Sequence, residues 1–420
     1  MIDLRPGQSF ETAVESLAPG DTLTVHAGTY ADYGRIGIGV QGTAVSPVVI
    51  RGASGEEMPL ITRPSDSTLQ NTINIEGATY VTIQGLEISG NGDGIDFYGA
   101  CHHINILDNH IHHIDVGLNF RSTAHHMVVR HNHIHDTGQG GDTGEGMYVG
   151  CNYAACAVSE SIIEGNWIHD SMSASQGDGI EIKAGSFSNI IRNNVIYNTH
   201  YPCILLYGTA GNPRNTVDGN VMWNCGDSGI QCAADAVIQN NIILSSPGNG
   251  FNSQDHQGVT PNNLEFKHNT IVGGSPCLRL MNWGGKSGMV FANNAVYCEG
   301  GTNYVESMSG VAVTGNVVVP APGNFPGSGY TLGRSAALDF LDAAGRNVYP
   351  TSDSRVIDAG DPAYGIPTDF NGTSRAGTPD AGAYTWTGVS NPGWLPGPGF
   401  KDAGEQDVIA PAAPQDLRTR

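Results

Sequence analysis

The sequence has few charged residues and no long apolar run. Of its 420 residues only 14% are charged, and 40 Asp and Glu against 19 Lys and Arg give a formal net charge of -21. Such a chain cannot neutralise a phosphate backbone, which excludes nucleic-acid binding. No apolar segment approaches the roughly 20 residues that span a bilayer, so we expect no membrane insertion. A polyanionic partner would require a local cationic spot or a bound divalent cation.

Familiar catalytic and metal motifs are also missing. There is no G-x-S-x-G, P-loop or H-E-x-x-H pattern. The eight Cys contain neither a CxxC pair nor zinc-type spacing. Cys151 and Cys156 flank a short loop and could form a local disulfide, and Cys225 and Cys232 could form another.

Glycine is abundant, with 58 residues. It is often the first residue of a four-residue pattern of small, apolar, polar and apolar residues, which we call the phrase. The phrase recurs at 94–97, 117–120, 146–149, 179–182, 203–206, 229–232, 250–253 and 277–280. Because side chains alternate along a strand, each copy predicts a strand with one apolar and one polar face. Cys203 and Cys277 replace the glycine, and we expect both to be buried as small hydrophobic residues.

A second marker, an Asn followed two positions later by an apolar residue, runs in step with the first. It occurs at Asn109, Asn132, Asn166, Asn194, Asn220, Asn241, Asn269, Asn294 and Asn316. Successive gaps of 21 to 34 residues are typical of one coil of a β-solenoid. Asn stacked at a tight turn can bond to its neighbours and to backbone, so we interpret this column as structural. Each coil should carry three short strands.

The first 60 residues carry a short amphipathic segment, Glu11 to Leu17, followed by Pro19-Gly20-Asp21 and a strand-like run. This opening resembles the N-terminal cap of bacterial right-handed parallel β-helix proteins, including pectin-lyase-like ones. The resemblance implies an all-β fold, a right-handed parallel β-helix (a single-stranded solenoid) with an N-terminal cap and an irregular C-terminal cap. The regions we expect are 1–72 (cap and first coils), 73–319 (coils), 320–389 (C-terminal cap, with a short helix at 335–345) and 390–420 (linker).

The stretch from Ala410 to Arg418 resembles the opening of a fibronectin type III module of the kind appended to secreted bacterial enzymes. Residues 1–3 have neither the basic segment nor the hydrophobic core of a signal peptide. We therefore expect a secreted, monomeric protein whose signal peptide has been removed.

Aligning the phrases places polar and aromatic residues on one outward face. Such a face suits an extended sugar polymer, through hydrogen bonds and ring stacking, and the extra residues at 137–145 and 150–161 are expected to wall a groove there. The expected substrate-binding residues are Asp96, Asn119, Arg121, Tyr148, Gln231, Asn252 and Gln254. A solvated polar face is the alternative interpretation.

Charged residues gather at the copy of the phrase at 179–182. Asp178 precedes it, Glu181 lies within it and Lys183 follows it, all within six residues. This run, followed by Gly185, Asn189, Arg192, Asn194 and Tyr197, resembles the calcium-binding coil of family 9 pectate lyases. The resemblance implies Ca²⁺ held by clustered carboxylates, with Asp178 and Glu181 at matching positions, and a basic side chain that abstracts the C5 proton of a uronate. Glu145, one coil earlier, is a third candidate ligand on geometry. Oxygen-only ligation suits Ca²⁺.

The identity of the base stays open. In the family the catalytic Lys lies one coil after the calcium cluster, where this chain has Tyr207. Lys183 is therefore one candidate, and Tyr207 and His256 are others. Arg279 is a further catalytic candidate, because an Arg or a divalent cation can neutralise the substrate carboxylate.

These features predict a Ca²⁺-dependent lyase that cleaves an acidic, uronate-containing polysaccharide by β-elimination. A glycoside hydrolase using paired carboxylates on the same fold is one alternative, and a non-catalytic carbohydrate-binding β-helix is another. Ten of the fifteen His lie between His102 and His135. His110 and His112 should stack over His133 and His135, either as a surface ladder or as a transition-metal site.

Overall fold

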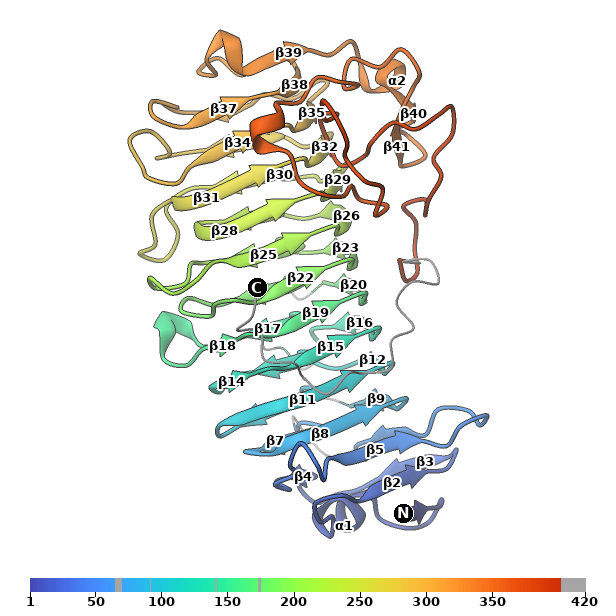
Figure 1. Cartoon of the computed structure of the whole chain (residues 1–420). Helices are drawn as coiled ribbons and strands as arrows, with labels where there is room; N and C mark the ends of the chain where they lie inside the picture. The colour runs from blue at the N-terminus through green and yellow to red at the C-terminus, as the bar shows by residue number, and fades with distance from the viewer. Residues whose placement is uncertain (65–69, 91, 140, 142, 173–174, 402–420) are drawn as a thin grey trace. The chain divides into compact units, whose positions relative to one another are not determined.

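The computed structural model describes residues 1–64, 70–90, 92–139, 141, 143–172 and 175–401. The described residues divide into two compact units, residues 1–190 and residues 191–401. Both units are all-β, and each winds as a right-handed parallel β-helix with three strands per coil, as the sequence predicts (Figure 1). Among the described residues no helix has the length and apolar character needed to cross a membrane.

The first unit contains three parallel sheets, each made of one strand per coil. The first sheet consists of β1 (Ile2–Leu4), β2 (Thr22–Val25), β5 (Val48–Gly52), β8 (Thr79–Gln84), β11 (Cys101–Leu107), β15 (Val128–Arg130) and β19 (Ile162–Glu164), with β14 (Ala124–His125) and β18 (Val158–Ser159) beside them. The second consists of β3 (Thr29–Ala31), β6 (Leu60–Thr62), β9 (Glu87–Ser89), β12 (His110–His112), β16 (His133–Thr137) and β20 (Trp167–Ser171). The third consists of β4 (Gly37–Ile38), β7 (Ile73–Glu76), β10 (Ile95–Tyr98), β13 (Leu118–Phe120), β17 (Met147–Val149) and β21 (Ile180–Ile182).

The second unit repeats this arrangement, and β22 (Ile190–Arg192) contains the boundary between the units. Its first sheet consists of β25 (Asn215–Asp218), β28 (Ala234–Gln239), β31 (Asn262–Lys267), β34 (Val290–Ala292) and β37 (Ala312–Thr314). Its second consists of β23 (Val195–Thr199), β26 (Val221–Cys225), β29 (Ile242–Leu244), β32 (Thr270–Val272), β35 (Ala295–Tyr297), β38 (Asn316–Val319) and β39 (Tyr330–Leu332). Its third consists of β24 (Ile204–Leu206), β27 (Ser228–Cys232), β30 (Asn249–Ser253), β33 (Leu278–Leu280) and β36 (Tyr304–Val305).

Both chain ends carry short non-solenoid elements. The amphipathic segment forms α1 (Phe10–Glu15), which is capped by the Ser9 hydroxyl accepting from the Thr12 N–H at 3.1 Å and buries Phe10. The helix expected at 335–345 is shorter, because α2 (Ala336–Asp339) gives way to β40 (Phe340–Asp342), which pairs antiparallel with β41 (Asn347–Pro350). Three single-turn 3-10 helices complete the elements: η1 (Asn152–Ala154), η2 (Gly327–Gly329) and η3 (Pro362–Tyr364). Most of the expected linker, residues 402–420, lies outside the described residues.

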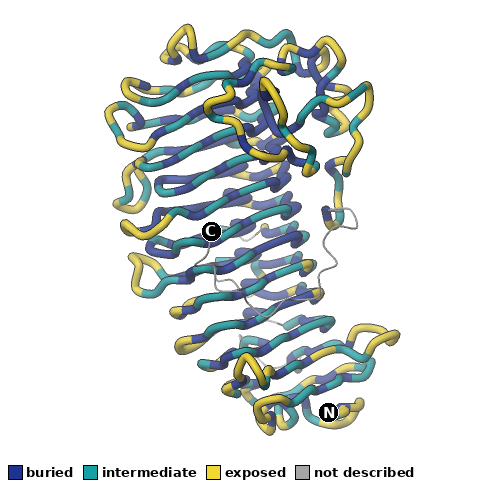
Figure 2. The backbone as a smooth tube through the Cα atoms, in the orientation of Figure 1, coloured by how far each residue is buried: buried dark blue, intermediate teal, exposed yellow. Residues whose placement is uncertain are grey.

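The glycine that opens the repeated phrase is required by close packing between coils. A Cβ atom at Gly146 would lie 2.6 Å from the Gly179 carbonyl oxygen and 2.6 Å from Cγ2 of Ile168. The apolar residues of the phrase, such as Ile180 and Ile182, are fully buried. Figure 2 shows the strands mostly buried and exposed residues gathered in the connecting loops. Burial of one apolar face in every coil is the main stabilising term of such a fold.

The Asn column forms a buried hydrogen-bond ladder, which confirms the structural interpretation. In the first unit Nδ2 of Asn109 donates to Oδ1 of Asn132 at 3.0 Å. In the second, Nδ2 of Asn194 donates to Oδ1 of Asn220, and Asn220 donates in the same way to Asn241, both at 2.9 Å. These side chains are at most 1% exposed. The ladder therefore fixes the spacing of successive coils within each unit.

The disulfide between Cys151 and Cys156 is present, but the one expected between Cys225 and Cys232 is wrong. Cys225 bonds to Cys203, and Cys232 is free and buried. Cys232 ends β27, four residues beyond Ser228, and a strand of that length spans about 13 Å, which exceeds the reach of a disulfide.

Cys203 and Cys277 are buried, as expected, but they are not merely small hydrophobic residues. Each forms a disulfide, Cys203 with Cys225 and Cys277 with Cys298, at sequence separations of 22 and 21 residues. These separations match one coil, so each bond joins positions about one turn of the solenoid apart.

Candidate carboxylate site

The polar residues of the repeated phrase stand in register on the third sheet of the first unit. The column runs Asn74, Asp96, Asn119, Tyr148 and Glu181, each paired with the next across neighbouring parallel strands. Parallel strands lie about 4.8 Å apart, so each side chain of the column contacts the next. This register places Tyr148 of β17 directly beside Glu181 of β21.

Two acidic residues occupy the same position in successive coils, immediately before the glycine of the phrase. The carbonyl oxygen of Glu145 accepts from the Gly117 N–H at 3.0 Å, and that of Asp178 accepts from the Gly146 N–H at 2.9 Å. Their side chains therefore start one coil apart, next to the strand that carries Glu181. Single carboxylate oxygens of Glu145, Asp178 and Glu181 all lie within 4.8 Å of one another.

Lys183 closes this group of three carboxylates. Its Nζ atom donates to Oε1 of Glu181 at 2.5 Å and lies 4.4 Å from the centre of the Tyr148 ring. The guanidinium carbon of Arg121 lies 5.7 Å from the same ring. Tyr148 thus has cationic side chains of Lys183 and Arg121 beside its ring, an attractive arrangement for a π system. We call Glu145, Asp178, Glu181 and Lys183 the carboxylate site.

The electrostatics of the site are unfavourable without further positive charge. Glu145 is fully buried, and burial, followed by the neighbouring charge of Glu181, raises its pKa to about 7. Oε2 of Glu145 accepts from the Thr143 hydroxyl at 2.5 Å, whereas Oε1 has no hydrogen-bond partner among the described residues. Among the described residues the amine of Lys183 bonds to Glu181, and a cation bound among the three carboxyl groups would lower the cost of ionising the buried Glu145.

The donor set fits a hard divalent cation. It offers oxygen atoms only, from three side chains that are each at most 1% exposed, and it includes the oxygen of Glu145 that bonds to nothing else described. Ca²⁺ prefers such carboxylate oxygens, whereas softer transition metals prefer nitrogen and sulfur. The geometry is therefore compatible with Ca²⁺, held by Glu145, Asp178 and Glu181.

The expected exposure of this face is wrong. Glu181 and Lys183, expected on the outside, are 1% and 4% exposed, as buried as Ile180 and Ile182 on the apolar face. Asp96, Asn119 and Tyr148 are likewise less than 10% exposed. Residues stacked in register cover one another, which single-strand alternation does not reveal. Of the segments expected to wall a groove, residues 140 and 142 lie outside the described part.

The remaining predicted residues belong to the second unit. The column of its third sheet runs Leu205, Gln231, Asn252 and Arg279 in register. Nδ2 of Asn252 donates to Oε1 of Gln231 at 3.2 Å, and Nε of Arg279 donates to Oε1 of Gln254 at 2.8 Å. Gln231 and Asn252, expected on an outward face, are 5% and 3% exposed.

Two of the candidate bases lie together in that unit. The ring centres of Tyr207 and His256 are 4.9 Å apart, and Tyr207 is only 3% exposed. Lys183 belongs to the first unit, so the structure divides the candidate bases between a carboxylate site and an aromatic pair.

Sequence reasoning missed several polar partners of the column. Nδ2 of Asn119 donates to Oδ2 of Asp93 at 2.6 Å, and Nδ2 of Asn71 donates to Oδ2 of Asp96 at 2.8 Å. A signal for Asp93 was present, because Asp93, like Glu145 and Asp178, directly precedes the glycine of the phrase. Asn71 has no comparable position.

Histidines form two further clusters in the first unit. The register of β12 with β16 pairs His110 with His133 and His112 with His135, as the sequence predicts. His102 and His125 pair across strands β11 and β14. The two clusters lie on the second and first sheets, respectively, whereas the carboxylate site belongs to the third.

Fold and site together define a parallel β-helix protein with a buried carboxylate cluster on one sheet. A family model described as "Right handed beta helix region" matches residues 37–214 and 144–318, which together span more than half of the chain. The chain belongs to this family. A comparison with curated proteins finds no match to the sequence.

Several solved structures share the fold. A pectate lyase, Pel9A, superposes with a TM-score of 0.59 at 14% identity, covering 92% of this chain and 96% of that one. An alginate lyase from Paenibacillus sp. str. FPU-7 gives 0.52 at 19% identity, covering 67% and 97%. XylC in complex with xylose gives 0.63 at 11% identity, covering 92% and 99%. At these identities the likeness establishes the fold alone.

Proposed function

We propose that this protein is a Ca²⁺-dependent polysaccharide lyase that cleaves a uronate-containing polymer by β-elimination. The observation that carries the proposal is the cluster of three buried carboxylates with Lys183 and Tyr148 against it. Two structural neighbours, an alginate lyase and a pectate lyase, support it, since alginate and pectate are acidic polysaccharides. A polymer of this kind does not cross membranes, so we also propose that the protein acts outside the cytoplasm.

Glu145, Asp178 and Glu181 would hold the cation. When bound, a divalent cation supplies positive charge that neutralises the substrate carboxylate and offsets the attraction of Glu181 for the Lys183 proton. Neutralising that carboxylate matters, because the proton on the adjacent C5 carbon becomes acidic only when the charge next to it is balanced.

Lys183 would act as the base. Its neutral amine takes the C5 proton, the C5–H electron pair forms a C4–C5 double bond, and the C4–O bond breaks. The leaving oxygen then takes up a proton, giving a new chain end and an unsaturated uronate. A positioned base of this kind contributes typically 10²- to 10⁴-fold to a rate. Tyr207 and His256 stay alternatives, as the aromatic pair of the second unit.

Tyr148 and Arg121 would bind the sugar. The Tyr148 ring stands beside Lys183, and the Arg121 side chain is 48% exposed while its Nε donates to Oδ1 of Asn119 at 3.0 Å. Nη2 of Arg121 also lies 3.8 Å from Oδ2 of Asp93, so these contacts orient a half-exposed guanidinium, the group whose fork geometry suits a carboxylate.

A glycoside hydrolase is the second candidate, because one observation favours it. Glu145, with a pKa near 7, is partly protonated at neutral pH, as a general acid must be.

An activity screen tests these alternatives. The full chain would be incubated with pectate, alginate, glycosaminoglycans and glucuronan, with Ca²⁺ or with EDTA. Ultraviolet absorbance of an unsaturated product that requires Ca²⁺ supports the lyase. New reducing ends without that absorbance identify a hydrolase, and binding to one of these polymers without any product leaves a carbohydrate-binding β-helix.

A further inference from the structure

The second sheet of the first unit carries histidines from three successive coils. His110 lies on β12, His133 and His135 lie on β16, and His169 lies on β20. Registers align His110 with His133, and His135 with His169. None of the four is exposed, and none is fully buried. This histidine cluster takes no part in the proposed lyase reaction.

The imidazole nitrogens of this cluster converge. Nε2 of His110 lies 2.8 Å from Nε2 of His135, and Nε2 of His133 lies 2.9 Å from Nε2 of His169. Single nitrogens of His110, His133 and His135 all lie within 4.8 Å of one another. Three imidazoles from two coils therefore present nitrogen atoms to one small volume, and His169 of the next coil adjoins it through its contact with His133.

Carboxylates fix the orientation of two of these rings. Nδ1 of His135 lies 2.7 Å from Oδ2 of Asp136, and Nδ1 of His169 lies 2.7 Å from Oδ2 of Asp170. An ionised carboxylate only accepts hydrogen bonds, so Nδ1 carries the proton and Nε2 turns a lone pair towards the cluster. A carboxylate behind the imidazole is the usual outer partner of a metal-binding histidine.

We propose that the histidine cluster binds one divalent transition-metal ion, of which Zn²⁺ is the type. Imidazole nitrogen is a ligand of Zn²⁺, Cu²⁺ and Ni²⁺ and not of Ca²⁺, so this site is chemically distinct from the carboxylate site. Two nitrogens bound to one tetrahedral Zn²⁺ lie roughly 3.3 Å apart, so the pairs at 2.8 and 2.9 Å would separate by about half an ångström.

His110, His133 and His135 would supply three ligands, and His169, whose Nε2 lies 2.9 Å from Nε2 of His133, would move in as the fourth. A shell closed by protein ligands is typical of a structural ion. The ion would join β12, β16 and β20 and hold three coils together at their edges. Binding to the folded state alone raises stability by mass action.

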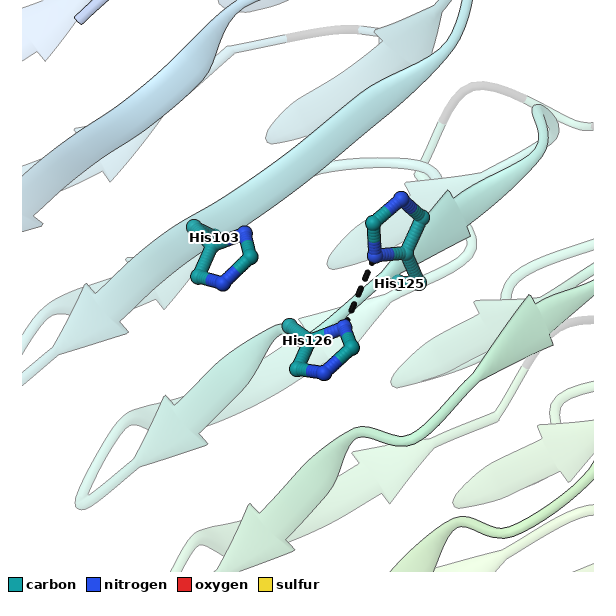
Figure 3. A group of neighbouring side chains, drawn as sticks. All are labelled: His103, His125 and His126. Atoms are coloured by element: carbon teal, nitrogen blue, oxygen red, sulfur yellow. Dashed lines mark hydrogen bonds between the residues drawn. The ribbon is translucent and has the colours of Figure 1, made fainter. Parts of the chain in front are cut away.

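A second histidine cluster in the same unit provides a matched comparison. Nitrogens of His103, His125 and His126 also lie within 4.8 Å of one another (Figure 3). As in the first cluster, two ring nitrogens lie at hydrogen-bond distance, here Nδ1 of His125 and Nδ1 of His126 at 2.8 Å. The acid next to His126, Glu160, is 3.6 Å away, beyond hydrogen-bond distance. This cluster has three imidazoles without the carboxylate support.

The test uses the full chain purified without a histidine tag, stripped with EDTA and then saturated with Ca²⁺ to occupy the carboxylate site. Zn²⁺ would be titrated calorimetrically, and Co²⁺ would be added separately to record its visible absorption bands. We expect one tight site per chain with a tetrahedral Co²⁺ spectrum. His135→Ala should weaken Zn²⁺ binding roughly 100-fold, and Asp136→Asn should weaken it about 10- to 100-fold.

The control variant is His125→Ala, which alters the second cluster and should leave the tight site intact. Absence of tight Zn²⁺ binding would overturn the proposal, as would unchanged affinity in His135→Ala or loss of the site in His125→Ala. Should His135→Ala misfold by circular dichroism, Asp136→Asn decides, because it keeps every imidazole and changes only the supporting carboxylate.

Discussion

Glu145→Gln gives a direct measure of the electrostatic cost of the carboxylate site. Glu145 has an ordinary pKa of 4.5, and burial together with Glu181 raises it to about 7 in the folded protein. The pKa of Glu145 is higher in the folded protein than in the unfolded chain. Between pH 4.5 and pH 7, Glu145 is therefore protonated in the folded protein and ionised in the unfolded chain. The stability linked to Glu145 is therefore complete below pH 4.5 and is lost as pH rises through 7. At 1.36 kcal/mol for each tenfold change, the loss is about 3 kcal/mol.

The assay is urea unfolding at pH 5 and pH 8, followed by tryptophan fluorescence, first in EDTA. From pH 5 to pH 8 the free energy of unfolding should fall by about 3 kcal/mol more in the wild type than in Glu145→Gln, because the amide of Gln does not ionise. Glu57→Gln, at an exposed position, is the matched control and should behave as wild type. Ca²⁺ at about 100 times its dissociation constant should then restore roughly 2.7 kcal/mol to the wild type at pH 8 and less to Glu145→Gln. Equal pH dependence in the two proteins would refute the raised pKa, and equal stabilisation by Ca²⁺ would refute the cation site.

Three further predictions concern the base, the Asn ladder and a disulfide. Lys183→Ala and Lys183→Arg should both lower the rate of unsaturated-product formation about 10²- to 10⁴-fold, whereas Tyr207→Phe should not; the reverse pattern would assign the base to Tyr207. Asn220→Ala should lower the free energy of unfolding in urea by about 1–3 kcal/mol, because buried donors and acceptors lose their partners. A change near zero would contradict the role of the ladder. Cys203→Ser removes the disulfide to Cys225, which closes a loop of 22 residues, and should lower the free energy of unfolding by about 3 kcal/mol relative to the oxidised wild type. If the variant is destabilised equally in reducing buffer, packing and not the crosslink is responsible.

Much of the fold could be predicted because its signature repeats. The Asn residues are buried in one ladder, so each coil needs the same amide at the same place. The glycine of the phrase repeats for a steric reason, since a Cβ atom at Gly146 would collide with the next coil. A constraint imposed once per coil becomes a period in the sequence, and that period predicts a solenoid.

Less of the site could be predicted, because burial depends on neighbouring coils. The alternation around Glu181 correctly placed its side chain away from Ile180, but that face is buried too, with the Tyr148 ring of the neighbouring strand against Lys183. The partner of Cys225 was missed for the same reason: Cys232 is near in sequence, whereas Cys203 is one coil away. Contacts between coils appear in a sequence only when both partners repeat.

The geometry of a parallel solenoid also bears on the cation proposed at one particular position. A side chain repeated in successive coils lies about 4.8 Å from its copy. Repeated amides hydrogen-bond to each other, as Asn109 does with Asn132, and the column next to the site alternates the acid of Asp96 with the amide of Asn119. Glu145 and Asp178 follow neither pattern, because two acids occupy equivalent positions in successive coils. Such a pair repels itself unless positive charge lies between the carboxylates. In the proposed function a divalent cation supplies positive charge beside the three acids, and it would bring that charge to the place where the uronate carboxylate is proposed to bind.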